Sequence, residues 1–506
     1  MGRRLNARVG AITLTGLIAV ASANAQAAAG DVACTQAGLA PVVTNHTARI
    51  GGQDIAYSAT ASFIHVTAAD AKSQACIFYT AYHQTNASPS QPRPVTFAFN
   101  GGPGSASLWL HLGALGPKRV DMGPTGMAPH QPFNLVPNES SLLDLSDVVM
   151  IDPVATGFTQ VDTGSDAKQF YGVMNDYKSI AEFIRNYLTQ FDRWSSPKFV
   201  AGESYGGIRA PLLVAHLQRD FGINMSGMIL ISPWMSTATT NFNDPGNDLA
   251  YAAYLPTYAT TAWYHKKQSA TSLAKSIDEM RAEVEAYAFG PYLDALALGN
   301  DLPESQRQAV IQKLVAYTGL SSEFIDQHNL RIADEDFFAN LFINEHKRVG
   351  RFDTRFVEGV TGNTTDDQGF DPSDAVITPP YTAAMNDYLI NDLNWHSQTP
   401  YVTGANLSVW PFNADGQEFG VMDQVSEALL DNPALRIYIA SGLYDLAVPY
   451  GTTKYNIRHL APYQGLPNRI SFGYFESGHM VYTNPASLTK LKADLKTFFG
   501  AATARP

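Results

Sequence analysis

Cysteine is almost missing from this sequence, whose 506 residues include only Cys34 and Cys76. So few cysteines exclude a disulfide-rich scaffold, and the lack of Cys-x-x-Cys and His-Glu-x-x-His motifs argues against a catalytic metal. Both cysteines precede every motif described below, so neither is placed like a catalytic nucleophile. In an oxidising compartment we expect them to form one structural bridge, with two buried free thiols as the alternative.

Long apolar runs and an excess of basic charge are missing as well. Arginines at positions 3, 4 and 8 precede an apolar segment over 9–21 and small residues at 23–25, which is typical of a secretory signal peptide. No later segment reaches the roughly 18 apolar residues that a transmembrane helix needs. The net charge of −12 argues against nucleic acid or an anionic membrane as a partner. We therefore expect a protein exported to the periplasm or the extracellular space.

What the sequence does contain is a Gly-x-Ser-x-Gly motif. Gly202-Glu203-Ser204-Tyr205-Gly206-Gly207 follows the apolar run Phe199-Val200-Ala201 and precedes a helix-like apolar pattern over 211–217. Between a strand and a helix this motif is typical of a nucleophile elbow, a tight turn that exposes the serine hydroxyl above the carboxyl end of a sheet. Ser204 is therefore the candidate nucleophile, and an ordinary glycine-rich turn is the alternative.

A serine nucleophile needs a histidine base that is held by a carboxylate. In α/β-hydrolases the acid and then the histidine follow the serine, each on a loop after a later strand. Two strand patterns near the C-terminus, 435–440 and 470–475, end in glycine-containing loops that carry Asp445 and His479 in that order. The predicted triad is therefore Ser204, Asp445 and His479.

Other residues compete for the acid and base roles. Asp431 precedes its strand and would lie at the wrong edge of the sheet. His459 belongs to a predicted helix, and His396 follows no strand end. Strand position therefore favours Asp445 and His479 over all three.

Acyl transfer also needs donors for the developing oxyanion, each worth roughly 3–4 kcal/mol of barrier. One is the backbone N–H of the residue after the nucleophile, here Tyr205, and the other comes from a loop after an early strand. The predicted strand 94–99 runs into Asn100-Gly101-Gly102-Pro103-Gly104. Its consecutive glycines let backbone amides turn toward the substrate, so this loop is the candidate for the second donor.

Four motifs follow one another along the chain: Asn100-Gly-Gly-Pro-Gly-Ser105, Ile151-Asp-Pro-Val-Ala-Thr-Gly-Phe158, Gly202-Glu-Ser-Tyr-Gly-Gly207 and Gly478-His-Met-Val481. Together they resemble the serine carboxypeptidases, peptidase family S10 of the α/β-hydrolase superfamily. The resemblance implies a mostly parallel central sheet with helices on both faces, no cofactor, and release of C-terminal residues from peptides with a free C-terminus. It further implies that the amides of Gly102 and Tyr205 form the oxyanion hole, and that Asn100 and Glu203 help to clamp the substrate's terminal carboxylate.

The sequence departs from the family pattern at three positions. Phe99 stands where a tryptophan is common, and Ser105 where a cysteine is common. Ala114 replaces a second clamp glutamate that usually precedes Leu-Gly-Pro. A glutamate donates to a carboxylate only when it is protonated, and a second carboxyl group would share that proton. His111 lies one helical turn before Ala114 and either supplies a positive contact instead or faces solvent.

The length of the chain predicts an insertion in the catalytic fold. Strand and helix patterns alternate up to 231, change to helical spacing, and return to strands near 435, which favours an α/β fold with a mainly helical cap. We expect a signal peptide over 1–25, the first part of the core over 26–235, the cap over 236–432 and the second part of the core over 433–506. Within the cap, 359–380 is expected to form a long polar loop.

Two further readings stay open beside a secreted serine carboxypeptidase. Ala114 keeps an esterase or an acyltransferase with the same triad possible, because the fold does not choose among acyl chemistries. A non-catalytic binding protein would be expected to lose a triad member, and none is lost. Seven aromatic residues are candidates for a groove between cap and core, although core packing is the alternative for each: Trp109, Trp234, Tyr251, Tyr254, Tyr258, Trp263 and Tyr264.

Overall fold

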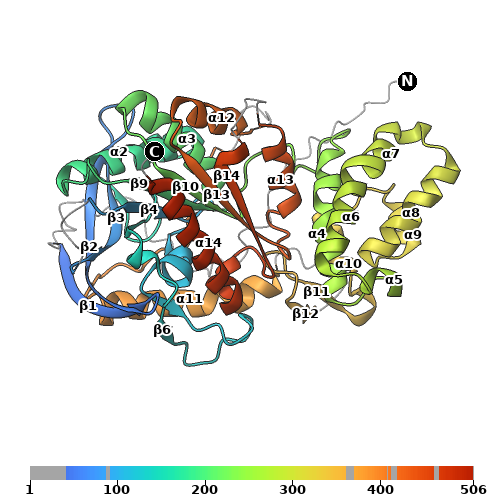
Figure 1. Ribbon diagram of the computed structural model, residues 1–506, viewed down its shortest axis with the longest axis horizontal. Coiled ribbons are helices and arrows are strands. Elements are labelled where there is room, and N and C mark those ends of the chain that lie inside the picture. The colour runs from blue at the N-terminus through green and yellow to red at the C-terminus, as the bar shows by residue number, and fades with distance from the viewer. Residues whose placement is uncertain are drawn as a thin grey trace, which may run out of the picture.

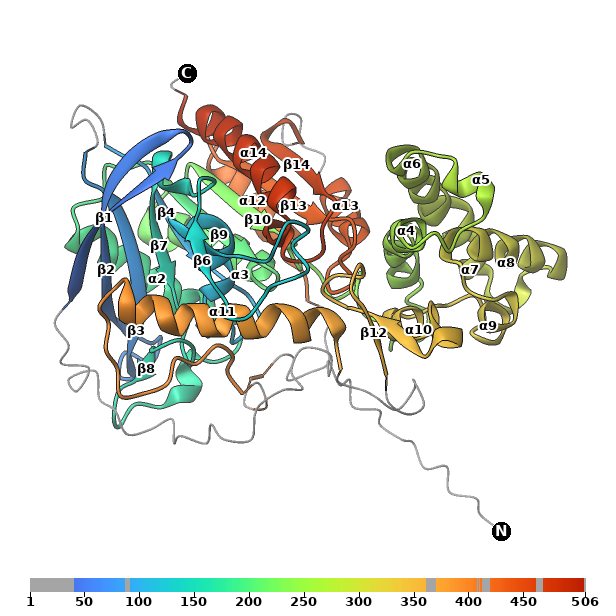
Figure 2. The ribbon, with the colours of Figure 1, turned by 90° about the horizontal axis from the view of Figure 1, so that it is seen from below.

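A ten-stranded sheet runs through the larger part of the molecule (Figures 1 and 2). The computed structural model describes residues 41–86, 92–360, 370–406, 408, 410–411, 419–460 and 467–504. The strand order is β1-β2-β3-β7-β4-β9-β10-β13-β14, and β8 pairs with β3. The strands are β1 (Val42–Ile50), β2 (Gln53–Thr67), β3 (Gln74–Gln84), β4 (Val95–Phe99), β7 (Asp147–Ile151), β8 (Gln160–Val161), β9 (Lys198–Glu203), β10 (Gly227–Ile231), β13 (Arg436–Gly442) and β14 (Ile470–Phe475).

The strands that carry the predicted site are parallel. From β7 through β4, β9, β10 and β13 to β14 every pairing is parallel, whereas β1, β2 and β3 form an antiparallel extension. β4, β7, β9 and β10 are buried along their whole length, as expected for parallel strands that have helices on both sides. Because the strands run the same way, their carboxyl ends meet at one edge, where the elbow and the Asp445 and His479 loops leave the sheet.

Helices cover both faces of the sheet, as the sequence predicts. On one face α2 (Val173–Gln190), α3 (Gly206–Phe221) and α12 (Met422–Asp431) share a hydrophobic cluster with the strands. On the other face a second cluster joins the sheet to α1 (Leu108–Leu110), the π-helix η1 (His111–Leu115), α11 (Pro372–Asn391) and α14 (Pro485–Thr503). Figure 2 shows α11 lying along this face.

A second, helical lobe packs beside the sheet next to α13 (Tyr450–Arg458) (Figure 1). Its helices enclose a hydrophobic cluster of their own, and α4 and α6 contact each other while α4 also contacts α13. An ion pair between Glu285 and Lys454 further joins the lobe to the core. The helices are α4 (Leu249–Tyr264), α5 (Ala270–Leu273), α6 (Ile277–Tyr287), α7 (Leu293–Leu298), α8 (Glu304–Thr318), α9 (Ser322–Gln327) and α10 (Asp334–Asn340).

The lobe is shorter than the insertion expected over 236–432, because α11 and α12 return to the core. The expected loop over 359–380 is wrong in its second half, where α11 begins. Asp371 caps this helix by accepting from the Ser373 amide, and Pro372 occupies its first turn, which proline tolerates. Before α11, β11 (Lys347–Val349) and β12 (Val357–Gly359) form a small hairpin that links the lobe to the core.

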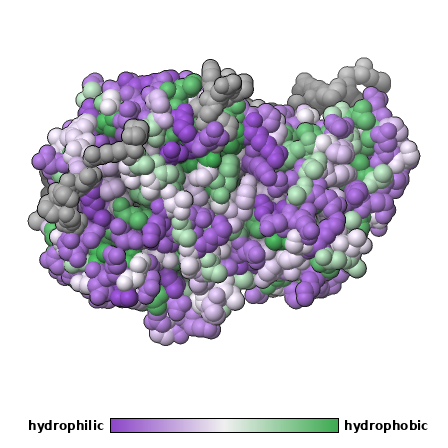
Figure 3. Space-filling view, in the orientation of Figure 1, coloured by the Kyte–Doolittle hydropathy of each residue, from purple (hydrophilic) through white to green (hydrophobic). Residues whose placement is uncertain are grey.

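The structure confirms the strands that the sequence predicts around the site. β4 and β14 match the predicted strands 94–99 and 470–475, and β13 covers the predicted strand 435–440 and continues to Gly442. Cys76 is buried in β3 and disulfide-bonded, which favours the predicted bridge over two free thiols. Cys34 and the predicted signal peptide lie outside the described residues, so the signal stays a prediction. On the face seen in Figure 3, hydrophobic residues form small patches between polar ones. No helix within the described ranges has the length and apolar character needed to cross a membrane.

Candidate active site

Ser204 occupies the turn between β9 and α3. Its φ is +59°, in the left-handed region that a serine adopts only at a cost, as expected for a nucleophile elbow. The surrounding structure fixes this conformation: the Ser204 amide donates to the Ile231 carbonyl at 3.0 Å, and the Ser204 carbonyl accepts from the Trp234 amide at 2.9 Å. Ser204 is half-buried, so its hydroxyl is held at the edge of the sheet without being sealed in the core.

Asp445 and His479 form a buried pair at the same edge. His479 Nδ1 lies 2.8 Å from Asp445 Oδ2, and the two side chains are 3% and 0% exposed. Asp445 Oδ1 also accepts from the amides of Ala447 and Val448, at 2.8 and 2.9 Å. Burial alone would lower the pKa of His479, but the Asp445 carboxylate outweighs it and raises that pKa above its ordinary value. The pairing leaves the other ring nitrogen of His479 to act as a base.

Ser204 and His479 are both tied to the end of β10. Ile231, the last residue of β10, accepts from the Ser204 amide, and the hydroxyl of the next residue, Ser232, donates to the His479 carbonyl at 2.7 Å. Among the described residues no hydrogen bond joins Ser204 Oγ to the His479 ring. Such bonds are often long before a substrate binds. The structure therefore brings all three predicted triad residues to one edge of the sheet.

The His479 loop is held by a segment that the sequence did not single out. The His479 amide donates to the Phe352 carbonyl at 2.6 Å, and the Gly478 amide donates to Asp353 Oδ2 at 3.1 Å. Arg355 contacts both carboxylate oxygens of Asp353, at distances between 2.6 and 3.2 Å. This segment lies between β11 and β12, so the connection from the lobe to the core also positions the base.

The two predicted oxyanion donors lie on adjoining backbone segments. Tyr205 caps the N-terminus of α3, where the helix dipole favours negative charge. A Cβ on Gly101 would lie 2.5 Å from the Tyr205 nitrogen, so only glycine allows the loop that carries Gly102 to come so close. Among the described residues, neither the Gly102 nor the Tyr205 amide has an acceptor. Both are therefore available to an oxygen bound beside Ser204.

Asn100 and Glu203, the predicted clamp, contact each other directly. Asn100 Nδ2 donates to Glu203 Oε1 at 2.8 Å, while Asn100 Oδ1 accepts from the Leu110 amide at 2.9 Å, which fixes the orientation of the amide group. Both side chains are buried. Burial raises the pKa of Glu203 to about 7, although the nearby His479 opposes the rise. Glu203 is therefore protonated, and able to donate, across the acidic range.

A buried ion pair between Arg209 and Asp176 contacts the backbone of this clamp. Arg209 in α3 is fully buried, donates to the Asn100 carbonyl at 2.6 Å and contacts both oxygens of Asp176 at 2.7 and 3.2 Å. Its guanidinium also lies over the rings of Phe99 and Tyr205, 5.0 and 5.1 Å from their centroids. Sequence reasoning missed Arg209, because an arginine within an apolar helix pattern gives no sign of what it faces.

Ala114 and His111 both lie on η1, and both are buried. Ala114 offers no carboxyl group to Glu203. The His111 ring contacts the hydroxyl of Tyr82 and packs against Tyr388, and burial lowers its pKa to about 3. His111 is therefore neutral in the acidic range, so both expectations for it, a positive contact and a solvent-facing side chain, are wrong.

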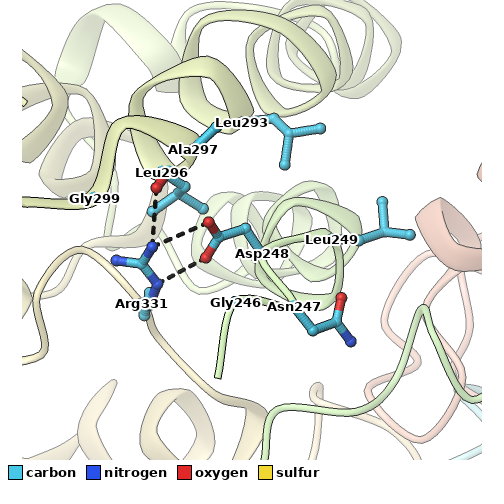
Figure 4. Close-up of a pocket in the computed structure, with 9 residues that line it drawn as sticks. All are labelled: Gly246, Asn247, Asp248, Leu249, Leu293, Leu296, Ala297, Gly299 and Arg331. Atoms are coloured by element: carbon cyan, nitrogen blue, oxygen red, sulfur yellow. Dashed lines mark hydrogen bonds and ion pairs between the residues drawn. The ribbon is translucent and has the colours of Figure 1, made fainter. Parts of the chain in front are cut away.

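The aromatic residues that are candidates for a groove between cap and core mainly pack in the protein interior. Tyr254 and Tyr258 are buried in the hydrophobic cluster of the lobe, and Trp234 packs against a core cluster. A pocket of about 560 Å³ opens in the lobe instead, beside an Asp248–Arg331 ion pair with contacts of 2.7 and 3.0 Å (Figure 4). None of the predicted site residues lines it. Its lining residues are Gly246, Asn247, Asp248, Leu249, Leu293, Leu296, Ala297, Gly299 and Arg331.

The model of the serine carboxypeptidase family matches residues 54–472. The chain belongs to this family. Among solved structures, a prohormone-processing carboxypeptidase from Saccharomyces cerevisiae superimposes with a TM-score of 0.53 at 16% identity, covering 87% of this chain and 91% of that one. This likeness shows the α/β-hydrolase fold that the sequence predicted.

Curated members of the family match over shorter stretches. A pheromone-processing carboxypeptidase from Yarrowia lipolytica is 28% identical over 171 residues, or 32% of this chain and 24% of that protein. Serine carboxypeptidase-like 36 from Arabidopsis thaliana is 31% identical over 154 residues, or 29% of each chain. The matched region therefore spans about a quarter to a third of the length of these relatives.

Proposed function

We propose that this family member is an exported serine carboxypeptidase that releases C-terminal residues from peptides. The observation that carries the proposal is the position of the Asn100–Glu203 pair. It lies directly beside the nucleophile and combines an amide donor with a carboxyl group whose pKa burial raises to about 7. A free C-terminal carboxylate bound there would place the last peptide bond next to Ser204. Export rests on the signal-like pattern of residues 1–25.

The proposed reaction begins with attack of Ser204 Oγ on the carbonyl carbon of the last peptide bond. His479 accepts the hydroxyl proton, and Asp445 holds the ring in the required tautomer. The amides of Gly102 and Tyr205 donate to the oxyanion. The C–N bond then breaks, the leaving amine takes the proton from His479, and an acyl-enzyme remains. Water activated by His479 hydrolyses this ester and restores Ser204.

The proposal is tested by comparing N-blocked dipeptides that have a free C-terminus with their C-terminal amides. A clamp predicts a much larger kcat/KM for the free acids at acidic pH. Equal values for acid and amide would reject the carboxypeptidase and favour an esterase or a broader peptidase with the same triad. Inclusion of an alcohol or amine acceptor, with products identified by mass, separates hydrolysis from acyl transfer.

A further inference from the structure

The space beside Gly113, which precedes Ala114 on η1, is filled by the ring of Tyr482. Tyr482 lies on η9 (Val481–Thr483), which follows the His479 loop and contacts η1. A Cβ on Gly113 would lie 2.2 Å from Cε2 of Tyr482 and 2.8 Å from the hydroxyl of Tyr381. Glycine at 113 therefore leaves room for an aromatic ring next to position 114, where the family pattern has a glutamate.

Two polar atoms at this place are buried and lack partners among the described residues. They are the Tyr482 hydroxyl and Oε2 of Glu203, the oxygen that does not bond Asn100. Burial, the charge of the Glu203 carboxyl and a side-chain contact with that carboxyl raise the pKa of Tyr482, whereas a contact with Asn100 opposes the rise. The Tyr482 hydroxyl therefore lies against both clamp residues, yet neither it nor Oε2 of Glu203 has a partner with the distance and angles of a well-formed hydrogen bond. A buried donor without an acceptor is costly. A ligand oxygen beside both groups would supply well-placed partners and remove that cost.

We propose that the Tyr482 hydroxyl is a third donor to the substrate's C-terminal carboxylate, beside Asn100 and protonated Glu203. It takes the place of the second carboxyl group that Ala114 lacks. This proposal rests on the proposed carboxypeptidase function, and it names a binding residue outside the motifs that identified the family.

A phenol and a carboxyl group differ in how their donation depends on pH. Burial raises the pKa of Tyr482 well above its ordinary value, so its hydroxyl keeps its proton across the neutral range. Glu203 loses its proton near pH 7. The other titratable groups that face Glu203 are His479, Asp445 and Tyr381. Tyr482 should therefore continue to hold a terminal carboxylate at pH values where Glu203 has begun to repel it.

The test compares wild type, Tyr482→Phe and a matched control, Tyr287→Phe. Tyr287 lies in the lobe, and its hydroxyl is also buried without a partner among the described residues. For each protein kcat and KM are measured with an N-blocked dipeptide and its C-terminal amide, at about pH 6 and about pH 8. One hydrogen bond to a charged group is worth roughly 10- to 100-fold in binding. Tyr482→Phe should therefore lower the acid-over-amide ratio of kcat/KM by that factor at both pH values, mainly through KM, and Tyr287→Phe should not.

The possible outcomes distinguish the carboxypeptidase function from the role of Tyr482. Equal rates of wild type on acid and amide would reject the carboxypeptidase function itself, and Tyr482 with it. A clear acid preference in wild type that Tyr482→Phe retains would reject Tyr482 alone. Melting temperatures are measured in parallel. A fall for Tyr482→Phe well beyond that of Tyr287→Phe would show that the hydroxyl serves the fold, which also rejects the proposal.

Discussion

The two halves of the candidate site differ in how completely their polar atoms are bonded. In the His479–Asp445 half, both Asp445 oxygens have partners and the loop behind His479 is held by the Phe352–Arg355 segment. In the clamp half, Oε2 of Glu203 and the Tyr482 hydroxyl are buried and have no well-formed hydrogen bond among the described residues. The groups proposed to move protons are thus oriented beforehand, whereas those proposed to bind substrate keep bonding capacity for it. Variants of each half should therefore fail in different ways.

The largest loss is expected for Ser204→Ala, because Ser204 serves both halves. In a comparable triad, removal of the nucleophile lowers kcat by about 10⁶-fold, and removal of the histidine costs about as much. His479→Ala should therefore match Ser204→Ala, and the double variant should be no worse than either. The measurement is turnover of a free-acid dipeptide, with circular dichroism to check folding. Substantial turnover by Ser204→Ala would reject the mechanism.

Asp445→Asn should impair only the His479–Asp445 half of the site. An amide at 445 no longer fixes the correct His479 tautomer, so kcat should fall on the order of 10⁴-fold while KM changes little. Asp431→Asn is the matched control. Asp431 is exposed at the end of α12 and pairs with Arg219, so its loss should leave turnover near wild type. A larger loss in the control than in Asp445→Asn would overturn the assignment of the acid.

Glu203→Gln alters the clamp half of the site and should change how kcat/KM depends on pH. Glu203 is neutral below its pKa of about 7 and ionises above it. Wild-type kcat/KM on free acids should therefore fall by up to tenfold per pH unit above 7, whereas a glutamine donates at every pH and should remove this fall. Because the Glu203 carboxylate also raises the pKa of His479, the rise of activity that reports His479 should move to lower pH in the variant. Identical pH profiles of the two proteins on free acids would contradict a protonated clamp.

Gly113→Ala should have the smallest effect, mainly on stability. Its methyl group would overlap the Tyr482 ring, and such overpacking typically costs about 1–3 kcal/mol of unfolding free energy. The control is Gly500→Ala in α14, where a Cβ meets nothing within 4 Å and helix propensity predicts a slight gain. Urea denaturation compares the two variants. A Gly113→Ala protein as stable as wild type would show that the ring can move away.

The sequence predicted the parts of the site that depend on chain order and local turns. Ser204, Asp445 and His479 follow strands whose apolar runs are easy to recognise, and the structure places them at one edge. It did not predict groups whose role comes from a distant neighbour. Arg209, the Asp353–Arg355 pair and Tyr482 matter because of residues far away along the chain, and no local pattern records such contacts. α11 was missed for another reason: its three prolines resemble loop residues, although Pro372 begins the helix.

The position of β14 near the end of the chain has a consequence for biosynthesis. This strand is the last to be made, and it leads directly into the loop that carries His479. After Ser204 is added to the growing chain, the ribosome must still add 479 − 204 = 275 of the 506 residues, more than half of the chain, to reach His479. Nascent chains and chains truncated before residue 479 therefore contain the proposed nucleophile without the proposed base, and we expect them to be inactive.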